Sequence, residues 1–264
     1  MTSVRRVRIA SLMCAAVVVS GVTGCVKSEG AVGEPGSSAS AFPADAFAGL
    51  TAQQIDRKAR DATSGAASLR IAGTFTTNAK SIEFDLAVTR AGTCKGSFND
   101  GTGILQVRKT SETAVYIQAE EAFWRAALAS RSKEFSPVQR DTVAERLGGH
   151  WVKADRAMAR TLGGGLCNLD KLMKPLLDGG TGNPVRVADS SVDGKPAAVL
   201  TERGKGGTSI LNVAKEGKPY VLTWESVGGA TSGKLTMGEY EKPVVVTPPP
   251  ASEIVTPPKP RPGS

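Results

Sequence analysis

The chain has 264 residues and a single histidine, and its 33 Lys and Arg outnumber its 25 Asp and Glu, which gives a net charge of +8. This length suffices for one domain with a sizeable hydrophobic core. Basic and acidic residues alternate along the chain and only 5% of the residues are aromatic, which argues against a nucleic-acid-binding protein. With His150 as its only histidine, the chain lacks the residues for most Ser–His, Cys–His and zinc-protease sites.

The first 24 residues have the pattern of a secretory signal peptide. Basic residues up to Arg8 precede an apolar run from about residue 9 to residue 19, and small residues follow. An uncleaved membrane helix or a buried core helix is the alternative, but the run is shorter than the roughly 20 residues needed to cross a bilayer. We therefore expect residues 1–24 to be removed, and because three arginines leave with them, the net charge falls from +8 to +5.

The signal segment ends in Val22, Thr23, Gly24 and Cys25, which closely resemble the lipobox of bacterial lipoproteins. The resemblance implies that Cys25 receives a diacylglyceryl group, with fatty acids such as palmitate, and becomes the first residue of the mature protein. Two acyl chains anchor a protein stably, whereas one holds only marginally. This predicts a protein on the extracytoplasmic face of the cell membrane, attached by its lipid, and the remaining positive charge favours anionic cell-wall polymers as partners.

The four cysteines have different predicted fates. Cys14 leaves with the signal peptide and Cys25 takes lipid, so Cys94 and Cys167 remain as a pair in an oxidising compartment. We expect a disulfide between them, with two buried free thiols as the alternative. Two cysteines and one distant histidine are too few ligands for a metal site, and no cofactor is expected.

Both ends of the mature chain have compositions that cannot form a core. Residues 25–41 are rich in Gly, Ser, Ala and Glu and predict a flexible tether that spans about 20 Å. Residues 241–264 contain prolines at 248–250, 257, 258, 260 and 262, which predicts a disordered proline-rich tail. The folded domain is therefore expected at residues 42–240.

The domain begins with a helix and a block of strands. Thr51 and Gln54 form a capping box for a helix over residues 51–62. Apolar and polar residues then alternate with the period of half-buried strands, and turn residues separate the runs. The predicted strands cover residues 69–76, 82–89, 94–98, 104–109 and 114–118.

Helices follow in the middle of the chain, and strands return after it. Ser136 and Gln139 form a second capping box, and helices are predicted over residues 120–129, 136–147, 155–162 and 168–177. Later strands are predicted at residues 185–188, 197–201, 208–214, 220–224 and 234–240. This order predicts an α+β fold in which a strongly curved antiparallel half-barrel of about ten strands wraps around several helices.

Four features occur together: the lipobox at Cys25, the helix of residues 51–62 leading into a strand, the Tyr116 strand leading to Phe123 and Trp124, and the later Gly-His-Trp-Val at residues 149–152. In this combination the chain resembles the LolA-like half-barrel lipoproteins, in particular the LppX/LprG group of actinobacterial envelope lipoproteins. The resemblance covers about residues 45–240 and implies an open sheet around helices, with a cavity for acyl chains of lipids or glycolipids. The disulfide pair and the proline-rich tail do not match features of that family.

Seven apolar side chains are candidates for the space between sheet and helices. They either fill a core or line a groove for a ligand. Abundant Ala and Gly in the helices, with few large aromatic residues, favour a void. The candidates are Phe75, Phe84, Leu86, Tyr116, Phe123, Trp124 and Trp151.

No residue pattern indicates catalysis. His150 lies between Gly149 and Trp151, where a structural or surface role is expected, and Glu120 and Glu121 lie at a helix start, where carboxylates favour the helix dipole. The leading hypothesis is a monomeric, non-enzymatic carrier or sensor of an acyl-chain ligand. The alternative is a structural or interaction lipoprotein of the cell envelope with a filled core and a tail that contacts the cell wall.

Overall fold

A computed structural model describes residues 45–77, 80–129, 135–178, 182–204, 207–228 and 231–258, all of which belong to one compact unit. The predicted signal peptide, Cys25 and the tether lie outside these residues. Within the described part of the chain, none of the helices combines the length and the apolar character that a membrane span requires.

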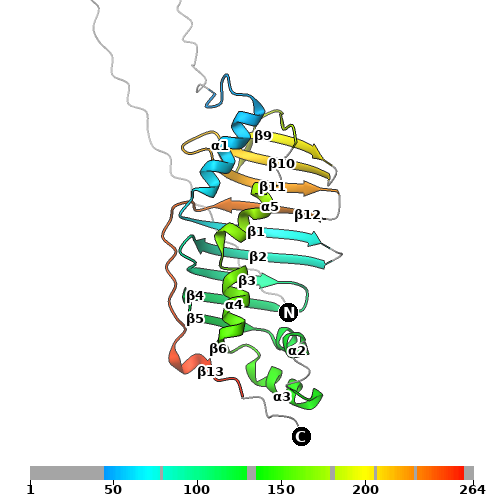
Figure 1. The fold of residues 1–264 in the computed structure, drawn as a ribbon, viewed down its shortest axis with the longest axis vertical. Helices are drawn as coiled ribbons and strands as arrows, with labels where there is room; N and C mark the ends of the chain where they lie inside the picture. Colours follow the sequence, from blue (N-terminus) through cyan, green and yellow to red (C-terminus); the bar gives the residue numbers. More distant parts are fainter. Residues whose placement is uncertain are drawn as a thin grey trace, which may run out of the picture. The chain divides into compact units, whose positions relative to one another are not determined.

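A single open sheet of 13 strands is the main element of the domain (Figure 1). β1 (Ser68–Thr77) pairs on one side with β2 (Lys80–Thr89) and on the other with β12 (Thr231–Gly238), so the early and late strands form the two halves of one sheet. The order is β13-β6-β5-β4-β3-β2-β1-β12-β11-β10-β9-β7, and β8 pairs with β9. The other strands are β3 (Cys94–Asn99), β4 (Ile104–Ser111), β5 (Ala114–Ala119), β6 (Trp151–Lys153), β7 (Val185–Arg186), β8 (Ser190–Val192), β9 (Lys195–Gly204), β10 (Gly207–Ala214), β11 (Val221–Val227) and β13 (Ile254–Val255).

The predicted α+β class, with a curved, mainly antiparallel sheet and several helices, is confirmed. The sheet has 13 strands where about ten were predicted, because the short strands β6, β8 and β13 carry too few residues for a recognisable alternation. All strand pairs are antiparallel except β13 with β6.

The helices begin where their capping residues predict. In α1 (Ala52–Ser64) the Thr51 hydroxyl accepts a hydrogen bond from the Gln54 backbone N–H at 3.2 Å, and the Gln54 side chain accepts one from the Thr51 N–H at 2.8 Å. Ser136 and Gln139 form the same box at α3 (Pro137–Leu147). The remaining α-helices are α2 (Glu121–Ala129), α4 (Arg156–Gly165) and α5 (Leu169–Asp178).

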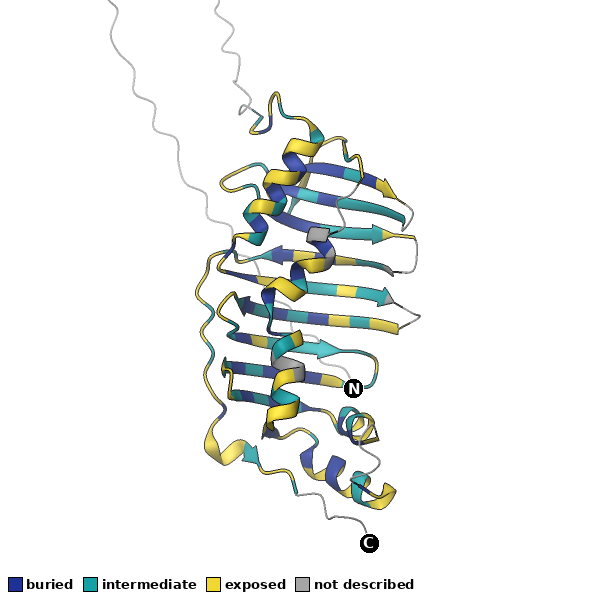
Figure 2. Ribbon diagram, viewed as in Figure 1, coloured by how far each residue is buried: buried dark blue, intermediate teal, exposed yellow. Residues whose placement is uncertain are grey.

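Helices α1, α5 and α4 lie across one face of the sheet, and α2 and α3 lie near its β6 end (Figure 1). We call this side the helix-covered face and the opposite side the outer face. Alternate strand residues supply the core under the helices, which appears as dark stripes on the strands in Figure 2. Among the fully buried side chains are Leu69, Ile71, Leu86, Leu105 and Ile117.

The predicted disulfide is confirmed. Cys94 at the start of β3 is bonded to Cys167 in the turn between α4 and α5, with the two Cα atoms 5.4 Å apart. Both cysteines are almost fully buried. The bond therefore ties the helical segment to the helix-covered face of the sheet.

The C-terminal segment, residues 242–258, corrects one prediction. Instead of forming a disordered tail, it passes the ends of the strands and reaches the sheet edge, where Ile254 and Val255 pair in parallel with Trp151 and Val152 (Figure 1). The Ser68 hydroxyl donates to the Lys242 carbonyl at 2.7 Å. Prolines are compatible with this course because an edge segment needs few backbone donors. Residues 259–264 lie outside the described residues.

Candidate ligand-binding site

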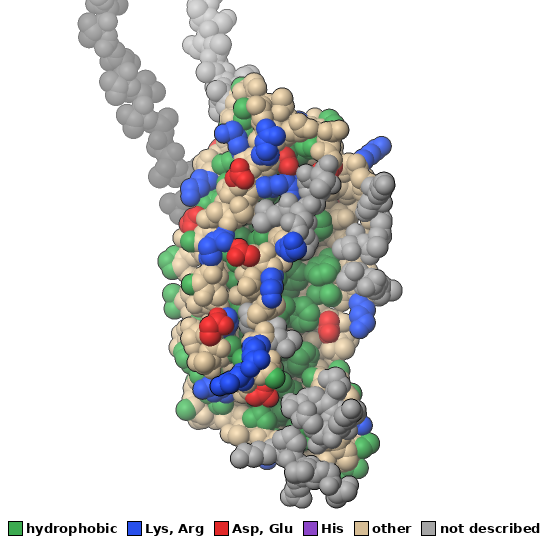
Figure 3. Space-filling model, viewed as in Figure 1, with side chains coloured by type: hydrophobic (Ala, Val, Ile, Leu, Met, Phe, Trp, Pro, Cys, Tyr) green, Lys and Arg blue, Asp and Glu red, His purple; other side chains and the backbone are tan. Residues whose placement is uncertain are grey.

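The helix-covered face carries an apolar surface beside the helices, visible as hydrophobic side chains in Figure 3. Phe75 and Phe84 lie on neighbouring strands and make an edge-to-face contact with ring centres 5.9 Å apart. Phe75 remains half-buried, whereas Leu86 is fully enclosed and belongs to the packed core. Phe84 is buried too, so of these three predicted groove residues only Phe75 is partly exposed on this face.

A cavity of about 270 Å³ lies at the β6 end of the domain. Helices α2, α3 and α4, strand β6 and the C-terminal segment enclose it. Most of its lining is aliphatic or aromatic, and Lys153 and Asp155 are the charged residues among those that line it. The lining residues are Trp124, Leu128, Phe135, Val143, Leu147, Val152, Lys153, Asp155, Met158, Pro257 and Pro258.

Trp124 lines this cavity and carries a buried polar atom. Its side chain is only 2% exposed, and its indole Nε1 has no hydrogen-bond partner within the described part of the chain. A buried donor without a partner costs about 1–3 kcal/mol, so such groups in native proteins call for an explanation. Phe123, the neighbouring candidate, contacts the Trp124 ring edge-to-face with centres 5.8 Å apart.

Two predicted groove residues face the other side of the sheet, and their assignment to the groove was wrong. Tyr116 alternates with the buried Val115 and Ile117, so its side chain points to the outer face. Trp151 lies on the same side, under the Arg108 guanidinium at 4.4 Å from the ring centre. The sequence interpretation placed large aromatic residues inside, but neighbouring aliphatic residues occupy the inward positions.

Several cavity residues were not predicted. Val143 and Leu147 lie four positions apart on α3, a spacing that indicates one inward helix face and that could have been recognised from the sequence. Pro257 and Pro258 could not have been recognised, because the C-terminal segment was expected to be solvated.

The residues considered for catalysis make contacts within the fold or lie exposed on its surface. The Glu120 carboxylate accepts a hydrogen bond from the Ile104 backbone N–H at 3.1 Å, and Glu121 pairs with Arg125 at 2.6 Å along α2. His150 is exposed, and its backbone N–H donates to the Leu147 carbonyl at 3.1 Å. In the described ranges no three His, Cys, Asp or Glu side chains are grouped as metal ligands would be.

The comparisons with known proteins concern the fold. No protein-family model matches this sequence, and no curated protein matches it. The solved structures to which the chain is similar include lipoprotein LppX from Mycobacterium tuberculosis, at 14% identity over 74% of this chain and 98% of that chain with a TM-score of 0.43. LprF from Mycobacterium bovis is 15% identical over 74% and 95% of the two chains, with a TM-score of 0.49.

A LolA superfamily protein from Nitrosomonas europaea is also similar, at 10% identity over 74% of this chain and 95% of that chain, with a TM-score of 0.23. These likenesses concern the arrangement of sheet and helices alone.

Proposed function

We propose that this protein is a lipid-anchored, monomeric lipoprotein of the extracytoplasmic membrane face that carries or senses an acyl-chain ligand, without covalent chemistry. The ligand is a lipid or glycolipid whose chain enters the cavity of α2, α3, α4 and β6. The observation that supports the proposal is an apolar cavity lined by Trp124, whose buried indole N–H has no hydrogen-bond partner in the described part of the chain.

The composition of the cavity suits one end of an amphipathic molecule. Ligand pockets commonly enclose about 300–1,000 Å³ and combine apolar walls with a few placed polar groups. At about 270 Å³ this cavity is small for a whole lipid and fits part of one acyl chain. The Trp124 N–H would donate to a carboxylate or ester oxygen, and the anchor at Cys25 would keep the cavity near a membrane.

The alternative, an interaction lipoprotein with a filled core, is favoured by the tight packing under the helices. Leu69, Leu86 and Ile117 have at most 1% of their surface exposed. The same alternative also assumes a free tail that contacts the cell wall, but residues 242–258 pack along the sheet. The two proposals differ in whether the cavity near Trp124 takes an apolar ligand.

Filling the cavity is expected to weaken ligand binding strongly. Met158 lines the cavity from α4 and is half-buried, so Met158→Trp places an indole in the space that an acyl chain would occupy. We expect cis-parinaric acid, titrated by its fluorescence, to bind the unchanged protein and to bind this variant at least about tenfold more weakly.

Val138→Trp is the matched control, because Val138 lies on α3 with 75% of its side chain exposed and does not line the cavity. It adds a large side chain without occupying the space. Equal binding by the unchanged protein and Met158→Trp, or no binding by either together with no copurifying lipid in native mass spectrometry, would contradict the carrier proposal.

Removing only the N–H of Trp124 separates polar from apolar recognition. Trp124→Phe keeps an aromatic ring but removes the donor, and a hydrogen bond to a charged oxygen contributes about 1.5–3 kcal/mol. Myristic acid should therefore bind at least about tenfold more weakly, measured by calorimetry. Tetradecane, which has no oxygen, should lose much less affinity; an equal loss for both would argue that Trp124 acts through packing alone.

A further inference from the structure

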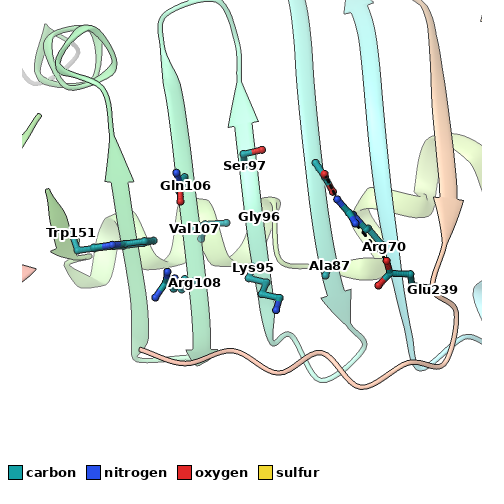
Figure 4. Close-up of a pocket in the computed structure, with 11 residues that line it drawn as sticks. Arg70, Ala87, Lys95, Gly96, Ser97, Gln106, Val107, Arg108, Trp151 and Glu239 are labelled. Carbon is teal, nitrogen blue, oxygen red and sulfur yellow. Dashed lines mark hydrogen bonds and ion pairs between the residues drawn. The ribbon is translucent and has the colours of Figure 1, made fainter. Parts of the chain in front are cut away.

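A second hollow, of about 570 Å³, lies on the outer face of the sheet and is separate from the acyl-chain cavity. Its floor is recessed because small residues meet there, namely Ala87, Gly96 and Ser97 on β2 and β3. Figure 4 shows Trp151 and Arg108 on one side of this floor and Arg70 with Glu239 on the other.

Strand register aligns the basic side chains of this face in one row. Lys95 lies opposite Arg108, Arg108 lies opposite Tyr116, and Tyr116 lies opposite Lys153. We call Lys95, Arg108 and Lys153 the basic row. Neighbouring strands are about 4.8 Å apart, so Lys95 and Arg108 lie side by side in the hollow, and Lys153 follows two strands further on, beyond Tyr116 and outside the hollow.

Among the described residues, no carboxylate forms an ion pair with the basic row. Arg108 stacks on Trp151 and donates to the Thr247 carbonyl at 3.4 Å, and Lys95 and Lys153 make no ion pair with any other described residue. Like charges directly opposite each other in a sheet destabilise it. Lys95 and Arg108 therefore form a pair whose repulsion a bound anion would relieve.

The carboxylates at the other side of the hollow are already paired. Arg70 bonds Asp85 at 2.5 Å and Glu239 at 3.5 Å. The hydrogen bonds from Arg70 lower the pKa of Asp85, so both members of the pair are charged at neutral pH. The anionic ligand must consequently sit over the β3–β6 part of the face.

Neutral hydrogen-bonding groups lie in the adjacent row. Ser97 lies opposite Gln106, and Gln106 lies opposite Gln118, which donates to the Gly149 carbonyl at 2.6 Å. Ser97 and Gln106 line the hollow. A hydroxyl and an amide beside a cationic row match the chemistry of a carbohydrate that carries acidic groups.

We propose that this outer hollow binds a linear anionic polysaccharide, with its acidic groups on the basic row and its hydroxyls on Ser97 and Gln106. A membrane surface fits less well, because the recessed floor would not meet a flat bilayer. Of the basic row only Lys153 also lines the acyl-chain cavity, and the test below changes Lys95, so one proposal can fail without the other.

Fluorescently labelled polygalacturonate, titrated into the soluble domain at several salt concentrations, is the test. Lys95→Glu should weaken binding about tenfold and lower the slope of log affinity against log salt by about one, as expected when one ion pair to a polyanion is lost. Lys95→Arg should retain binding. Lys58→Glu, at an exposed position of α1, changes the net charge equally and should leave the affinity nearly unchanged.

Three outcomes would overturn the proposal. Equal losses for Lys95→Glu and Lys58→Glu would mean that only net charge matters. Equal affinity for neutral dextran would remove the role of the acidic groups. Binding to phosphatidylglycerol vesicles that depends on Lys95, without binding to the polymer, would assign the surface to a membrane.

Discussion

Replacing Cys94 and Cys167 together by Ala is expected to lower the free energy of unfolding by about 4 kcal/mol. The bond joins residues 73 positions apart, and on the chain-entropy model loops of this size restrict the unfolded chain by about that amount. The turn between α4 and α5 should be held less firmly in the double variant, since the bond fastens this turn to β3. Urea unfolding followed by circular dichroism measures the change.

Reduction of the unchanged protein provides the control for side-chain effects. Dithiothreitol cuts the bond and leaves both sulfur atoms in place, so the unchanged protein should lose nearly as much stability as the double variant. The double variant itself should not respond to the reductant. A loss below about 1 kcal/mol in both experiments would mean that packing alone holds α4 and α5 on the sheet.

The second large effect is expected from Gly96→Ala. Gly96 has a φ of +148°, and a Cβ atom built there would lie 1.9 Å from the carbonyl oxygen of Asp85 on the neighbouring strand. The backbones of β2 and β3 must therefore move apart, at a cost of about 3 kcal/mol. Because Gly96 and Asp85 both line the outer hollow, the hollow should change shape as well.

Gly238→Ala is the matched control for this prediction. Gly238 lies at the end of β12, its φ is not positive, and a Cβ atom there meets nothing within 4 Å. The change should be neutral or stabilise by up to about 1 kcal/mol, because Ala restricts the unfolded chain. Thermal unfolding of both variants gives the comparison, and similar midpoints for the two would show that the β2–β3 contact adapts without cost.

Local signals explain which parts of the fold could be predicted. The capping boxes at Thr51 and Ser136 involve residues three positions apart, so no distant part of the chain is needed to recognise them. The alternation of apolar and polar residues along a strand can likewise be recognised from neighbouring residues alone. The pairing of Cys94 with Cys167 followed from elimination, because the other two cysteines had other predicted fates.

The candidate site was predicted only in part, because alternation does not say which face is inside. Phe75 and Phe84 lie on the helix-covered face as expected, but Tyr116 and Trp151 lie on the outer face. Aromatic size suggested burial under the helices. In β5 the aliphatic neighbours Val115 and Ile117 take those positions.

The sequence by itself determined the elements, the α+β class and the disulfide, because these depend on short-range spacing, hydrophobic period and the count of available cysteines. Only the tertiary structure decided which strands are neighbours, and with them the cavity at Trp124 and the basic row that begins at Lys95. It also brought Pro257 to that cavity. Both sites join residues distant in the chain, and strand register and packing alone bring such residues together.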